Sequence, residues 1–107
     1  MLIYVAHEYL DDMQNIVKAK EVTEQLQEKD LENLYICPLV AFPILRNKSI
    51  CLEDKTALKL DLVCGSHKMI IASNYGSKEL KAEIDLAKKL MNADGEPMEV
   101  VYLEHRR

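Results

Sequence analysis

Two continuous apolar runs constrain the fold of this chain more than any other feature. Leu2–Ala6 and residues 69–72 hold only apolar or aromatic residues, several of them β-branched. Regular alternation with polar residues would indicate a strand with one wet face, whereas continuous runs are typical of strands covered on both faces. We therefore predict an α/β fold with helices on both sides of a sheet.

The segments after the first run complete a strand–helix–strand unit. Apolar residues recur at helical spacing through residues 13–29, and Asp11 or Asp12 is placed to cap the start of that helix. Residues 33–37 form a second short strand, which Pro38 ends. A unit of this length predicts two parallel strands joined by a right-handed crossover.

The second half of the chain continues the alternation. It predicts, in order, a helix, a strand, a helix and a strand at residues 52–64, 68–72, 77–91 and 98–103. Gly65 is placed to end the first of these helices in a left-handed turn. Residues 1–107 then make one three-layer domain around a mainly parallel sheet of four to five strands, in the order 2-1-3-4.

Charge and cysteine content exclude several classes of protein. The 107-residue chain carries a formal net charge of −4 with its lysines scattered among acids, which favours neither a nucleic-acid nor a membrane partner. Its three cysteines form no C-x-x-C pair and its histidines lack metal-ligand spacing. We predict free thiols in a cytoplasmic protein that uses no metal and no cofactor. Residues 1–6 are too short and too uncharged for a signal peptide.

The predicted sheet has one crevice, at the carboxyl ends of its strands. Ligands of such sheets bind where the strand order reverses, here between the first and third strands. This rule brings residues 7–9, 38–42 and 73–77 together. The candidate ligand-binding side chains are His7, Tyr9, Phe42, Asn74 and Ser77. The structural alternatives are packing for the tyrosine, a loop hydrogen bond for the histidine and a helix N-cap for Ser77.

Glu83 is the first candidate for chemistry. At about 100° per residue, one apolar stripe of its helix is formed by Leu80, Ile84, Ala87 and Met91. Glu83 points into the same apolar arc. A carboxylate that points inward loses hydration, as catalytic carboxylates do. The alternative is a glutamate at the edge of the helix whose carboxylate reaches water.

Asp61 is a second candidate that points inward. The apolar side of the helix at residues 52–64 is predicted from Ala57, Leu58, Leu62 and Cys64. The same angular count turns Asp61 toward this side, close to Leu58. Two alternatives stay open for its carboxylate: a hydrogen bond to a loop, or contact with substrate in the crevice.

Four motifs occur in one order along nearly the whole chain. They are Tyr4-Val5-Ala6-His7, Pro38-Leu39-Val40-Ala41-Phe42-Pro43, Asp61-Leu62, and Ser77-x-x-x-Lys81-Ala82-Glu83-Ile84-x-x-Ala87. In this combination the chain resembles the nucleoside 2-deoxyribosyltransferase-like superfamily, especially its short phage and bacterial members. The resemblance implies a flavodoxin-like, Rossmann-like domain that assembles as a homodimer or a larger homo-oligomer.

The same resemblance implies a reaction. Glu83 matches a nucleophile that attacks the anomeric carbon of a nucleoside or nucleotide and expels the base. An acceptor base or water then resolves the glycosyl ester, which makes the protein a transferase or an N-glycosidase. Asp61 matches an acid that orients the sugar or the base, and Ser77 matches a residue facing the substrate's 5′ side. Tyr4 and His7 match residues that line the pocket.

Glu79 separates two hypotheses about function. It stands where relatives favour glycine, and its charge would repel a 5′-phosphate. A side chain turned outward leaves room for substrate, whereas one turned inward favours a non-catalytic protein that binds or sequesters a nucleotide-like ligand, such as a phage-encoded modulator. A third hypothesis is a partner-binding role for the apolar residues 38–45.

Overall fold

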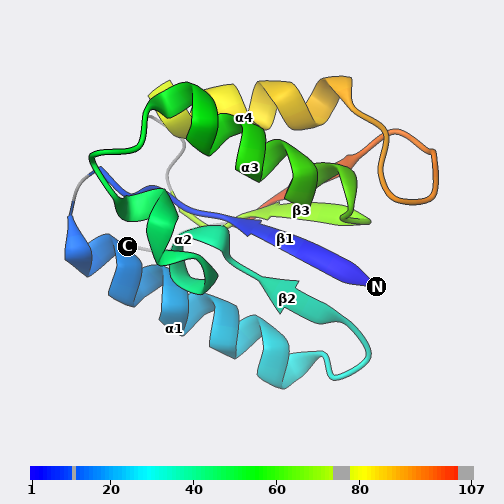
Figure 1. Cartoon of the computed structure of the whole chain (residues 1–107). Coiled ribbons are helices and arrows are strands. Elements are labelled where there is room, and N and C mark those ends of the chain that lie inside the picture. The colour runs from blue at the N-terminus through cyan, green and yellow to red at the C-terminus, as the bar shows by residue number, and fades with distance from the viewer. Residues whose placement is uncertain (11, 74–77, 104–107) are drawn as a thin grey trace.

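The computed structural model describes residues 1–10, 12–73 and 78–103. Within these residues the sheet has four strands, all parallel, in the order β2-β1-β3-β4, which confirms the predicted α/β topology. The strands are β1 (Leu2–Ala6), β2 (Leu34–Ile36), β3 (Lys68–Ile71) and β4 (Glu99–Tyr102). Figure 1 shows the sheet as the middle layer of the molecule.

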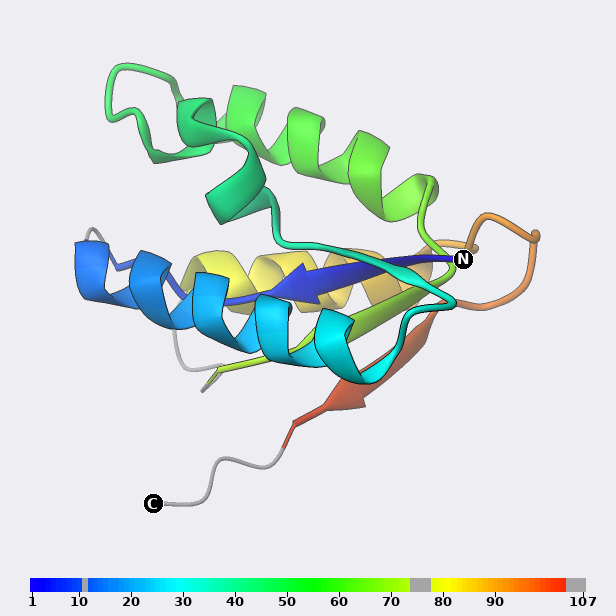
Figure 2. The same ribbon diagram turned by 90° about the horizontal axis from the view of Figure 1, so that it is seen from below.

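Helices lie on both faces of this sheet. They are α1 (Met13–Lys29), α2 (Pro38–Ala41), the 3-10 helix η1 (Pro43–Arg46), α3 (Leu52–Cys64) and α4 (Lys78–Lys89). In Figure 1, α1 lies below the sheet, and α3 and α4 lie above it. Figure 2, seen from below, shows the chain from α2 through α3 grouped at the upper side of the view. The predicted three-layer arrangement is therefore confirmed.

The side chains of β1 alternate between two apolar clusters. Tyr4 and Ala6 pack in the cluster that includes Ile84 of α4, whereas Val5 packs in the cluster that includes Ile16 of α1. Both faces of the strand are thus removed from water, at a gain of roughly 1.5–3 kcal/mol for each large apolar side chain. This explains why the run is continuously apolar.

Two helix ends test the sequence predictions. The carboxylate of Asp12 accepts a hydrogen bond from the N–H of Gln14 at 2.9 Å, so Asp12 caps α1 as predicted. The left-handed turn predicted at Gly65 is wrong, because its φ is −85° and its ψ is −2°. The Gly65 N–H ends the helix by donating to the Asp61 carbonyl at 3.2 Å, and the buried Ser66 hydroxyl donates to the Leu62 carbonyl at 2.6 Å.

The predicted apolar side of α3 is also wrong. Of its four predicted members only Leu62 packs against the core, whereas Ala57, Leu58 and Cys64 are exposed, as is Asp61; Val63 is fully buried and Lys59 partly so. Apolar residues are spread around this helix without a dominant stripe, so an angular count has little to select between its faces. The contact with α4 and the sheet selects the side that carries Val63.

The apolar stripe predicted for α4 is confirmed over three of its four members. Leu80, Ile84 and Ala87 are buried in the core, whereas Met91 is exposed. Helix α4 ends at Lys89, and Met91 forms an isolated bridge with Pro97 instead. The residue therefore leaves the stripe because the helix stops before reaching it.

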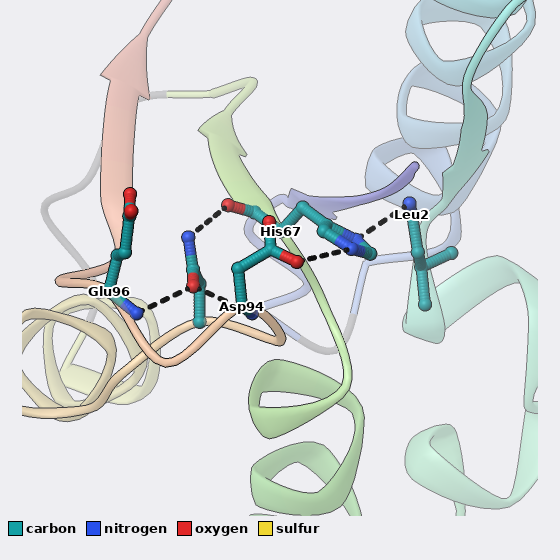
Figure 3. A network of polar contacts seen from close by, with 5 residues as sticks. Leu2, His67, Asp94 and Glu96 are labelled. Atoms are coloured by element: carbon teal, nitrogen blue, oxygen red, sulfur yellow. Dashed lines mark hydrogen bonds and ion pairs between the residues drawn. The ribbon is translucent and has the colours of Figure 1, made fainter.

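A polar network ties the loop before β4 to the amino end of β3 (Figure 3). The Asn92 side-chain oxygen accepts from the N–H groups of Asp94 at 2.9 Å and Glu96 at 3.0 Å, and its amide donates to the His67 carbonyl at 3.3 Å. The Nδ1 atom of His67 accepts from the Leu2 N–H at 3.1 Å, and Nε2 lies 3.7 Å from the Asp94 carboxylate. His67 thus joins backbone segments at the amino ends of the strands.

Candidate active site

A cavity of about 70 Å³ lies beside the carboxyl end of β1. It is lined by His7, Glu8, Tyr9, Leu39, Leu45, Lys55, Lys59, Glu79, Leu80 and Glu83. The loop after β1, the α2–η1 segment, α3 and α4 all contribute to its wall. This is the position at which parallel sheets place their ligands, and the predicted crevice is found there.

Glu83 projects inward from α4. Only 9% of its side chain is exposed, so the predicted inward direction is confirmed, and the alternative of a glutamate with a hydrated head is wrong. The direction follows from the register of the helix, because Leu80, Ile84 and Ala87 fix the buried face on which Glu83 lies. A buried carboxylate needs partners, since an unpaired one is costly in the interior.

Two side chains supply those partners, one for each carboxylate oxygen. The hydroxyl of Tyr4, fully buried on β1, donates a hydrogen bond to Oε1 of Glu83. The Nζ atom of Lys59, on α3, lies 3.6 Å from Oε2, and 15% of the Lys59 side chain is exposed. Burial and the neighbouring Glu83 charge raise the pKa of the Tyr4 phenol well above its usual value, so that it stays a donor.

Burial also disfavours the charged form of Glu83. Removal from water raises the pKa of the Glu83 carboxyl, and the negative charge of Glu79 adds to this rise. The Lys59 ammonium and the Tyr4 hydrogen bond act the other way, because both stabilise the carboxylate. The site thus holds an acid whose charged form depends on two specific neighbours.

A second cavity, of about 380 Å³, opens between α3 and α4. It is lined by Thr56, Lys59, Val63, Lys78, Glu79, Ala82, Glu83 and Leu86. Three side chains, Lys59, Glu79 and Glu83, line both cavities. The Lys59–Glu83 pair therefore stands where the two spaces meet, and together they reach the size range of small-molecule sites.

The loop after β1 is held by local hydrogen bonds. The Nδ1 atom of the buried His7 lies 2.8 Å from the carbonyl oxygen of Glu8, and the N–H of Glu8 donates to the Ser73 hydroxyl at 2.8 Å. These contacts join the ends of β1 and β3. Both His7 and Tyr9 line the smaller cavity, as the crevice prediction requires, and the loop hydrogen bond considered for His7 is present as well.

Two of the predicted site residues lie elsewhere. Asp61 and Phe42 line a separate apolar groove together with Ile44, Leu58 and Leu62. Asp61 is exposed there because α3 is turned with Lys59 inward, and two residues further along a helix the side chain points to the other side. Phe42 follows the last turn of α2 and does not line the crevice, to which Leu39 of the same helix contributes.

Asn74 and Ser77 were also predicted to bind ligand, and both lie outside the described residues. Tyr4, predicted to line the pocket, instead lies behind it and contacts Glu83. Glu79 is exposed yet lines both cavities, so neither the outward nor the inward alternative describes it completely.

Sequence reasoning missed Lys59. A lysine in the middle of a helix reads as a surface residue, and its buried position depends on how α3 is turned. One signal was available. An inward glutamate demands a cation or several donors, so the lysines of the preceding helix, Lys55 and Lys59 among them, were candidate partners.

The part of the chain that the structure describes contains no group of three or more His, Cys, Asp or Glu side chains suited to a metal ion. Cys37, Cys51 and Cys64 are free, as predicted. No described helix is both long and apolar enough to span a membrane. Comparisons with protein-family models, with curated proteins and with solved structures found no significant match.

Proposed function

We propose that this protein cleaves or exchanges the N-glycosidic bond of a (deoxy)nucleoside or nucleotide, with Glu83 as the nucleophile. The observation that carries the proposal is the Glu83 carboxylate, which is buried, held by Tyr4 and Lys59, and open to two adjoining cavities. Its position beside the carboxyl ends of the strands agrees with where α/β folds perform chemistry. The resemblance of the sequence motifs supports the same residue.

The two oxygens of Glu83 have different surroundings. Tyr4 holds Oε1 by a hydrogen bond, whereas Oε2 lies 3.6 Å from the Lys59 ammonium, beyond ordinary hydrogen-bond length. Oε2 therefore keeps lone pairs for attack. As its bond to the anomeric carbon forms, the carbon–nitrogen bond breaks, and the base departs with the electron pair and takes up a proton from water. An acceptor base or water then displaces the glutamate in the second step.

The test is a search for free base. The protein is incubated with a panel of nucleosides and their 5′-monophosphates, with and without an acceptor base such as adenine or cytosine, and products are separated by chromatography. Base release in water identifies a hydrolase, and a new nucleoside formed only with the acceptor identifies a transferase. If no compound in the panel reacts, the enzymatic proposal is wrong.

One observation favours a second candidate, a non-catalytic protein that binds a nucleotide-like ligand. Burial raises the pKa of Glu83, so its carboxyl keeps its proton to a higher pH than a glutamate at the surface does. A protonated carboxyl donates a hydrogen bond to a ligand and does not attack. This candidate is distinguished by a ligand-induced rise in melting temperature in the absence of any turnover.

The proposal includes a cytoplasmic location and a homo-oligomer. Three free cysteines are typical of proteins in a reducing compartment. The groove that holds Phe42 is apolar, and its rim exposes 41% of Phe42, 50% of Ile44 and 44% of Leu58. Exposed apolar clusters of this kind mark contact surfaces.

Introducing a charge into the groove tests the oligomer. Phe42→Asp is expected to convert a dimer or larger assembly to monomers, because an unpaired carboxylate in an apolar interface is strongly unfavourable. Sedimentation velocity gives the assembly state of both proteins. Lys48→Asp, in the exposed loop after η1, is the matched control and should keep the assembly of the original protein.

A further inference from the structure

Lys59 is placed differently from an ordinary helix lysine. Its ammonium lies between α3 and α4, 3.6 Å from Glu83, and its side chain is 15% exposed. Burying an ammonium is unfavourable unless an opposite charge compensates it, and Glu83 is the partner that the structure places there. The other lysine that lines the smaller cavity, Lys55, lies one turn earlier on α3, and no ion pair of Lys55 occurs among the described contacts.

We propose that Lys59 is a positioning residue that keeps the Glu83 carboxylate charged and keeps its Oε2 atom facing the two cavities. This inference rests on the proposed function, in which Oε2 attacks the sugar. Tyr4 alone fixes only one oxygen, so the plane of the carboxylate can still turn about the axis through Oε1. The ammonium beside Oε2 removes that freedom and supplies the missing charge.

Among the groups around Glu83, Lys59 is the cation that can stabilise the charged carboxylate. Besides Lys59, the titratable groups that face Glu83 or line its two cavities are Tyr4, His7, Glu8, Tyr9, Cys37, Lys55, Lys78 and Glu79. Glu8 and Glu79 add negative charge, and the Tyr4 phenol stays neutral. Burial raises the pKa of the Cys37 thiol to about 11, so it is neutral too. Lys59 is the cation in contact with the carboxylate.

The consequence is a defined pH dependence. Without Lys59, burial and the Glu79 charge act on Glu83 unopposed except by Tyr4, so the carboxyl holds its proton to higher pH. A merely structural lysine would lower turnover equally at all pH values. A positioning lysine lowers turnover most on the acidic side, where the carboxyl becomes protonated.

The experiment compares Lys59→Met, Lys59→Arg and Lys81→Met. Methionine keeps the length of the stem without its charge, and arginine restores the charge. Lys81 lies on the exposed face of α4 and loses the same charge without touching Glu83. The readouts are the pH profile of base release and the pH titration of the Glu83 carboxyl, followed by NMR of protein labelled with ¹³C-glutamate.

We expect Lys59→Met to move the acidic limb of the profile and the Glu83 titration midpoint to higher pH, with turnover at pH 6 falling by about tenfold or more. Lys59→Arg should restore most of both, and Lys81→Met should change neither. An unchanged Glu83 titration in Lys59→Met overturns the inference. The titration needs no substrate, so a shifted midpoint in a protein that releases no base contradicts the proposed function alone.

A second measurement applies if Lys59→Met does not fold. In protein labelled with ¹³C-lysine, Glu83→Gln should shift the Cε signal of Lys59 more than that of Lys55 or Lys81, because Lys59 is the ammonium beside the altered group. A larger shift at either of the other two lysines would overturn the assignment of the pair.

Discussion

Glu83→Gln is expected to reduce base release by about 10³-fold or more and to remove the loss of stability that the original protein shows as its Glu83 carboxyl ionises. The amide has nearly the shape of the carboxylate, and its oxygen can still accept the hydrogen bond from Tyr4. It cannot form a glycosyl ester that later releases the sugar. Ligand binding should persist, because the walls of both cavities stay in place.

The change in the pH dependence of stability follows from the direction of the Glu83 pKa shift. Burial raises the pKa of Glu83 in the folded protein above its unfolded value. Ionisation of the carboxyl therefore destabilises the folded state relative to the unfolded state. Below the unfolded pKa both states are protonated and the cost is absent. As pH rises through the folded pKa the full cost develops, and a neutral glutamine avoids it.

Urea unfolding at several pH values measures this effect. As the pH rises from 4 to 7, the free energy of unfolding of the original protein should fall relative to that of Glu83→Gln, in which residue 83 does not titrate. Asp85→Asn, on the exposed face of α4, is the control and should alter neither turnover nor the pH dependence of stability. Undiminished base release by Glu83→Gln would remove Glu83 from the mechanism.

Tyr4→Phe is expected to lower turnover by roughly tenfold to hundredfold. A hydrogen bond to a charged acceptor contributes about 1.5–3 kcal/mol, and its loss leaves Oε1 of Glu83 unpaired in a buried place. The Glu83 carboxyl should therefore titrate at higher pH, because the hydroxyl stabilises its charged form. The measurements are turnover across pH and the NMR titration of labelled glutamate.

Tyr35→Phe provides a matched control for that substitution. The Tyr35 hydroxyl donates to a carboxylate oxygen of Asp30 at 2.7 Å, so this variant also removes a phenol–carboxylate hydrogen bond, but beside β2 and away from the cavities. It should leave turnover unchanged. If the two variants lose activity equally, the Tyr4 contact has no special part in the reaction.

The two side chains that hold Glu83 come from two different layers of the domain, the sheet and the helix layer that contains α4 (Figure 1). Tyr4 reaches Glu83 from the sheet, and Lys59 reaches it from α3, so the carboxylate is held between rigid elements. Catalytic groups held in this way lose little free energy to reorganisation during the reaction. The arrangement gives physical support for a nucleophile at this position.

The strand order and the inward direction of Glu83 were predictable because each depends on local pattern. Leu2–Ala6 is apolar on both faces, which demands helices on both sides of the sheet. Connections of this length allow mainly right-handed crossovers, which leaves few strand orders. In α4, Leu80, Ile84 and Ala87 define one buried face so strongly that the direction of Glu83 follows from angle alone.

Helix α3 shows what local pattern left open. Its apolar residues point in several directions, so its sequence was compatible with either Asp61 or Lys59 facing the core. Only packing against α4 and the sheet turned Lys59 toward Glu83 and left Asp61 in the outer groove with Phe42. A weakly amphipathic helix gains little free energy from one rotation over another, and contacts distant in sequence decide its orientation.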